Sequence, residues 1–202
     1  MQRTLYLLLL VSMLSLASTS LIACGGGGGM GGLANMVPGA PKTTEVELTM
    51  DTMCPKCSKE SHAAINPFDQ PVKYTKVSIE KVDAFVEAAN KTYGSVMVAE
   101  KLLTVAGDAA DGSAPAGFQS AQEVRSLATG MMEAATKDIP TLISSGQDLV
   151  TNLPGELQSD PTKALVLDKA LTEVKTSIER LNEAQAKLTG LGDGAADEEG
   201  GE

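Results

Sequence analysis

The chain has 202 residues and a net charge of −10, which suits one domain with flexible ends and argues against binding to nucleic acid. Aromatic residues make up 3% and there is no Trp, so ring platforms for stacking sugars or bases are not expected. There is 1 histidine, His62, so a second histidine for acid–base or nucleophilic catalysis is missing and we predict that the protein is not an enzyme.

The first 23 residues have the features of a secretory signal. Arg3 gives a positive start, residues 5–16 are almost wholly apolar, and the small residue Ala23 comes directly before Cys24. A membrane-spanning helix needs about 20 predominantly apolar residues, a length that residues 4–23 reach only if their Ser and Thr are included. We therefore predict a signal peptide over residues 1–23.

The sequence Leu21-Ile22-Ala23-Cys24 resembles the lipobox of bacterial lipoproteins. This resemblance implies that Cys24 becomes the mature N-terminus and carries a diacylglycerol thioether. Two acyl chains give firm anchoring, because each buried CH₂ contributes about 0.8 kcal/mol. Gly25 stands where some bacterial lipoproteins have a retention signal of the Asp type, so we expect an exported protein in the outer rather than the inner membrane. Its expected partners are the membrane, through the lipid, and a protein of the cell envelope.

A flexible tether is predicted over residues 24–43. Gly residues dominate its first part, and Pro38 and Pro41 follow. Such a segment buries little apolar surface and is costly to order. The folded part of the protein therefore begins near residue 44.

Residues 44–76 are predicted to be an extended or looped segment that contains a CxxC motif. Val46, Leu48 and Met50 alternate with polar residues, which indicates a short strand. The motif Cys54-Pro55-Lys56-Cys57 follows, and residues 58–70 should form a loop or one short helical turn.

Three interpretations of Cys54 and Cys57 remain open. In an exported protein they can form a disulfide bond. The order of strand, CxxC and possible helix resembles the start of a thioredoxin-like fold, which implies a redox pair. Residues 46–57 also resemble the cysteine loop of heavy-metal-associated domains, which implies binding of copper(I) by two thiolates. A closed zinc site needs four ligands, and only Cys54, Cys57 and His62 are candidates, so we predict no cofactor and no zinc site; His62 alone is expected at the surface.

Three long amphipathic helices are predicted over residues 77–190. We expect Ser78 to cap the first, Pro140 to bend the second, Pro154 and Gly155 to end it, and Asp160 and Pro161 to begin the third. Apolar residues recur at steps of three and four along each helix. The expected seams are Val82, Val86, Ala89, Tyr93, Val96 and Leu103; then Val124, Ala128, Met131, Ala135, Ile139, Leu142, Gly146, Leu149 and Leu153; then Leu167, Leu171, Val174, Ile178, Leu181, Gln185 and Leu188.

The expected fold is an all-α antiparallel bundle of about three long helices, followed by an acidic disordered tail over residues 191–202. The lack of a catalytic constellation favours a structural or protein-interaction role. The alternative hypothesis is a thiol-redox or soft-metal-binding protein that acts through Cys54 and Cys57.

Overall fold

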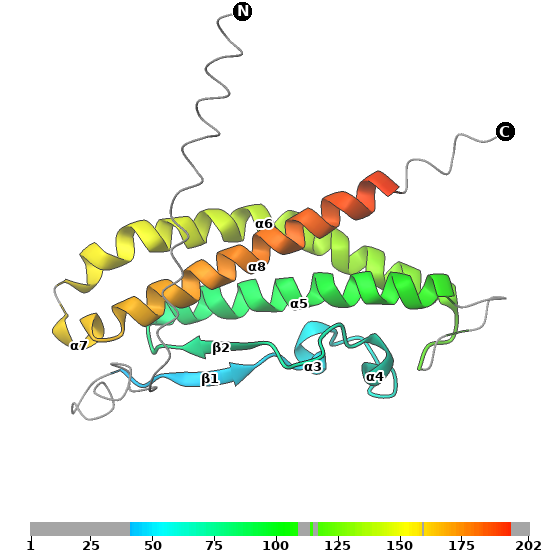
Figure 1. Ribbon diagram of the computed structural model, residues 1–202, viewed down its shortest axis with the longest axis horizontal. Coiled ribbons are helices and arrows are strands. Elements are labelled where there is room, and N and C mark those ends of the chain that lie inside the picture. Colours follow the sequence, from blue (N-terminus) through cyan, green and yellow to red (C-terminus); the bar gives the residue numbers. More distant parts are fainter. Residues whose placement is uncertain (1–40, 109–113, 115–116, 159, 195–202) are drawn as a thin grey trace, which may run out of the picture. The chain divides into compact units, whose positions relative to one another are not determined.

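A computed structural model describes residues 41–108, 114, 117–158 and 160–194 (Figure 1). The predicted signal peptide, Cys24, nearly all of the tether and most of the acidic tail lie outside these residues. None of the helices in the described ranges is long and apolar enough to cross a membrane.

The three long helices are α5 (Glu80–Asp108), α6 (Ala121–Leu157) and α8 (Leu167–Gly194). Each of them contacts the other two, and α6 runs antiparallel to both α5 and α8 (Figure 1). The predicted all-α bundle of three long helices is therefore confirmed. α8 reaches Gly194, so the helix ends four residues beyond the predicted boundary at residue 190.

The core lies where the three helices meet, and most of the predicted seams are buried there. At two positions the burial is shifted by one residue, and the other seam residues that are not fully buried are half-buried. Leu102 is fully buried while Leu103 is half-buried, and Ala184 is fully buried while Gln185 is exposed. Both shifts follow from the fact that each helix packs against two neighbours, so its buried face is wider than a single seam. The largest fully buried side chains along the helices include Val82, Val86, Val96, Leu102, Val124, Ile139, Leu153, Val174 and Leu181.

Helix α6 begins with a variant of the capping box, in which Glu123 bonds the residue before the N-cap, and it bends along its length. The hydroxyl of Ser120 accepts from the Glu123 N–H at 3.1 Å, and the Glu123 carboxylate accepts from the Gln119 N–H at 2.8 Å. Pro140 lies inside the helix and lacks the N–H that would bond Thr136, which explains the bend about midway along α6 in Figure 1.

The prediction that Pro154 and Gly155 end this helix is wrong. α6 continues through both residues to Leu157. Leu153 and Leu157 are both buried in the core, and burying two Leu side chains outweighs the one backbone hydrogen bond that Pro154 removes.

The predicted third helix is divided into a short helix, α7 (Pro161–Ala164), and the long helix α8. The Asp160 carboxylate accepts from the N–H groups of Thr162 at 3.1 Å and Lys163 at 3.3 Å, so the predicted cap is confirmed. Bonding from the Thr162 hydroxyl and from Lys163 lowers the pKa of Asp160 to about 2. Val166, directly between the two helices, turns into the core and is 2% exposed.

A two-stranded antiparallel sheet precedes the bundle. The predicted strand is present in its first part as β1 (Thr44–Glu47), whereas Met50, predicted to belong to it, begins a helix. β1 pairs with β2 (Lys73–Lys76), which the sequence analysis missed. Short helices α3 (Met50–Met53) and α4 (His62–Ile65) lie between the strands, the second of them in the predicted place. α5 contacts β2, α3 and α4, so this whole segment covers one side of that helix (Figure 1).

The predicted cap of α5 is also corrected. The Ser78 hydroxyl donates to the Lys42 carbonyl at 2.6 Å and does not cap the helix. Instead, the Asp83 carboxylate in the first turn accepts from the N–H groups of Val77 at 2.7 Å and Ser78 at 3.0 Å. Ser78 has a φ of 59°, so its backbone turns sharply from β2 into the helix.

A buried polar contact links α5 to α8 within the apolar core. Asn90 is fully buried, and its Nδ2 donates to the Val86 carbonyl at 2.7 Å and to the Ser177 hydroxyl at 3.1 Å. Arg180 donates to the Asn90 Oδ1 and to the Lys73 carbonyl of β2. Because its polar atoms are paired, this contact fixes the relative position of the two helices.

Candidate functional site

Cys54 and Cys57 form a disulfide bond in a tight turn at the end of α3. Their sulfur atoms are 2.00 Å apart. The Cys54 N–H donates to the Met50 carbonyl at 2.8 Å, and the Cys57 N–H donates to the Cys54 carbonyl at 3.0 Å. Of the three interpretations of this pair, the disulfide bond is the one present in the structure.

A glycine of α5 allows the cysteine segment to pack closely on the bundle. A Cβ atom at Gly94 would lie 2.6 Å from Met53 Sδ and 2.7 Å from a methyl carbon of Leu48, so no larger residue fits without movement. The Ser95 hydroxyl donates to the Met53 carbonyl at 2.9 Å. The turn that carries the disulfide is thus held against α5 by both packing and a hydrogen bond.

The two cysteines differ in exposure. Cys54 is 1% exposed and belongs to a second core cluster with Val98, Ala99 and Leu102, while Cys57 is half-buried. Cys54 follows the C-terminus of α3 and is not placed at a helix N-terminus. In a redox motif of the thioredoxin type the first cysteine is accessible at a helix N-terminus. The observed geometry disfavours that alternative.

His62 is less exposed than the sequence suggested. Its side chain is half-buried at the start of α4, and its Nε2 is buried with no hydrogen-bond partner in the described part of the protein. The expectation of a surface histidine is corrected accordingly, because α4 turns this residue toward the domain. Across the described ranges no three His, Cys, Asp or Glu side chains are grouped so as to hold a metal ion, so Cys54, Cys57 and His62 do not form such a group.

A groove of about 1080 Å³ lies between α5 and α6, with the disulfide turn at one end. Small residues form most of its walls, and Leu127, Met131 and Leu142 contribute half-buried apolar side chains. Its lining from α5 is Ala88, Lys91, Thr92 and Ser95; its lining from α6 includes Ser126, Gly130, Ala134, Asp138 and Thr141.

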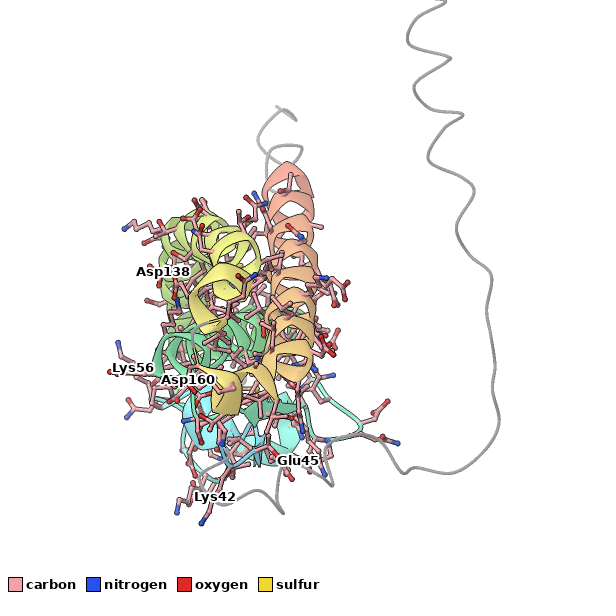
Figure 2. All side chains as sticks on the ribbon, turned by 90° about the vertical axis from the view of Figure 1, so that its left-hand side faces the viewer. Lys42, Glu45, Lys56, Asp138 and Asp160 are labelled. Atoms are coloured by element: carbon pink, nitrogen blue, oxygen red, sulfur yellow. A yellow bond between two sulfur atoms is a disulfide. The ribbon has the colours of Figure 1, made fainter. Side chains whose placement is uncertain are left out.

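Charged residues of opposite sign border this groove. Lys91 of α5 lies on one side, Glu123 and Asp138 of α6 lie on the other, and Lys56 lies at the end formed by the disulfide turn. In Figure 2, Lys56 and Asp138 are seen on the same side of the molecule, the former beside the turn and the latter on α6. The groove therefore presents an apolar floor between a basic and an acidic edge.

The sequence analysis did not find this groove. It assigned Met131 to the core, and Met131 does pack against the second core cluster, but it also lines the groove and its Sδ is 4.0 Å from Cys54 Sγ. A usable signal was present in α6, where Ser126, Gly130 and Ala134 recur every four residues and lie on one helix face.

Comparison of this chain with models of protein families, with curated protein sequences and with solved structures gives no match.

Proposed function

We propose that this chain is a lipid-anchored protein of the bacterial cell envelope that binds a helix of a partner protein in the groove between α5 and α6. The groove carries the proposal for binding, and the lipobox carries the proposal for anchoring. No catalytic role is assigned to the described residues, in line with the single histidine of the chain.

The form of the groove suits an amphipathic helix. Two adjacent antiparallel helices form its walls, and a further helix between them would extend the bundle in the way that helices pack in four-helix proteins. From Glu123 to Leu142 the α6 wall is about 28 Å long at 1.5 Å per residue, equivalent to about five turns of a bound helix. Small side chains at Ser126, Gly130 and Ala134 allow the bound helix to approach α6 closely.

The charges at the edges define what the partner helix should carry. Lys91 favours acidic residues on one flank of the bound helix and Lys56 favours them at one end, while Glu123 and Asp138 favour basic residues on the other flank. Half-buried Leu127, Met131 and Leu142 favour apolar residues along the face between those flanks.

Filling the groove tests the binding proposal. A Cβ atom at Gly130 would meet no other atom within 4 Å, so Gly130→Leu should extend into the groove without a clash. Gly inside a helix is about 0.8–1.0 kcal/mol less favourable than Ala, and Leu ranks next to Ala, so the domain should stay folded. With a photo-crosslinking residue in place of Ser126, we expect one adduct of defined mass in native envelopes, and we expect Gly130→Leu to abolish it.

The matched control is Gly155→Leu in the same helix. Gly155 is also free of atoms within 4 Å of an added Cβ, and it does not line the groove. The adduct should persist in this variant. An adduct that survives Gly130→Leu, or none at all in the unaltered protein, would refute the groove as a helix-binding site.

Lipid attachment is tested separately through Cys24. The Ser hydroxyl cannot form the thioether, so Cys24→Ser should abolish incorporation of labelled fatty acid and leave a precursor of higher mass. Conservative replacement of Cys57 by Ser provides the control, because that cysteine lies in the disulfide turn and should not affect labelling. Fatty-acid incorporation by the Cys24→Ser protein would show that the lipobox interpretation is wrong.

A further inference from the structure

We propose that Cys54, Cys57 and Met131 form a three-sulfur site for Cu(I) when the disulfide is reduced. Three sulfur atoms come together where the disulfide turn meets α6. Cys54 Sγ is bonded to Cys57 Sγ and lies 4.0 Å from Met131 Sδ. The sequence assigned Met131 to core packing, and the fold brings it to the cysteines across 77 positions of sequence. This inference is independent of the proposed helix binding.

The distance between Cys54 and Met131 fits a trigonal metal site. A metal–thiolate bond is about 2.3 Å long, so two sulfur ligands of a planar three-coordinate ion are separated by about 4.0 Å. The two atoms therefore already have the spacing of ligands to one ion. Only Cys57 Sγ has to move away from Cys54 Sγ, and a Cα–Cα distance of 5.3 Å between the cysteines allows this by side-chain rotation.

The ligand set selects a soft monovalent ion. Thiolate and thioether sulfur favour Cu(I), whereas a structural Zn²⁺ site needs four ligands, usually Cys and His. The described residues offer no group of three His, Cys, Asp or Glu side chains here, so a zinc site cannot be completed from them. Two thiolates and one Cu(I) carry a net charge of −1, and the ammonium of Lys56 lies between the two cysteines in the sequence to offset it.

Reduction precedes metal binding. A dithiol reductant supplies two electrons and two protons: the Cys54–Cys57 bond breaks, each sulfur becomes a thiol, and the dithiol becomes a disulfide. Cu(I) then binds with release of the two thiol protons as two Cu–S bonds form, and Met131 donates a lone pair without losing a proton. Cys54 and Met131 both line the groove, which gives the ion a route to them.

The test is a titration of the reduced full-length mature protein in detergent with Cu(I), against a coloured Cu(I) chelator. We expect one Cu(I) per chain, an X-ray absorption spectrum with three sulfur neighbours, and no comparable binding of Zn²⁺. Met131→Leu conserves volume, so the fold should be retained. It should weaken Cu(I) binding at least about 10-fold, because even residues that only hydrogen-bond the metal ligands contribute about 10–100-fold to affinity. The copper ion bound to this variant should have two sulfur neighbours in place of three.

Met132→Leu is the matched control, since Met132 is the neighbouring half-buried methionine of α6 and does not line the groove. It should bind Cu(I) as the unaltered protein does. The proposal is overturned if the reduced protein does not bind Cu(I), or if Met131→Leu binds it as tightly and with the same sulfur count as the unaltered protein.

Discussion

Replacing Gly146 with Leu is expected to lower the free energy of unfolding by about 3 kcal/mol or more. Both of the other long helices lie close to the α6 backbone at Gly146. A Cβ atom there would lie 2.6 Å from Phe85 Cζ of α5 and 2.8 Å from Ile178 Cγ1 of α8. A Leu side chain adds three further carbon atoms, so α6 has to move away from both neighbours at once.

Helix propensity acts in the opposite direction and provides the control. Gly inside a helix is about 0.8–1.0 kcal/mol less favourable than Ala, and Leu ranks next to Ala. Gly155→Leu, at a position of α6 with open space around it, should therefore leave stability unchanged or raise it. Chemical unfolding followed by circular dichroism measures both variants. If Gly146→Leu is as stable as Gly155→Leu, the three helices do not meet at Gly146 as described.

The long helices could be predicted because their local signals agree with their packing. Apolar residues recur at steps of three and four, and Asp160 with Pro161 marks a helix start by the chemistry of their own side chains. The errors lie where distant packing overrides such signals. Pro154 fails to end α6 because Leu153 before it and Leu157 after it are both buried, and this burial depends on helices far away in the sequence.

The segment before the bundle was harder to predict for the same reason. β2 has only four residues, and its pairing with β1 joins Thr44 to Lys76 across the whole cysteine segment. The groove was missed because it is a space between α5 and α6 rather than a motif within either. The closeness of Cys54 and Met131 likewise depends on how α3 packs on α5 beside Gly94, which no local pattern reveals.

Truncating Leu181 to Ala should lower the free energy of unfolding by about 2–5 kcal/mol. Leu181 of α8 has an exposed fraction of 0% and belongs to the main core cluster, which contains residues of all three long helices. The loss combines the transfer of its side-chain carbons with the cavity that remains, because helices held by many other contacts collapse only partly into it.

The same Leu-to-Ala change at the surface shows how much of the loss in stability comes from burial rather than from the change of residue type. Leu165, between α7 and α8, is 52% exposed, so Leu165→Ala removes the same atoms and should change stability by less than about 0.5 kcal/mol. The two measurements also determine the register of α8. Leu181 is followed in the core by Ala184, while Gln185 faces solvent, so Gln185→Ala should behave like Leu165→Ala. A loss of several kcal/mol for Gln185→Ala together with a negligible loss for Leu181→Ala would show that α8 is rotated about its own axis relative to this description, because the two residues lie one turn apart on nearly the same side of the helix.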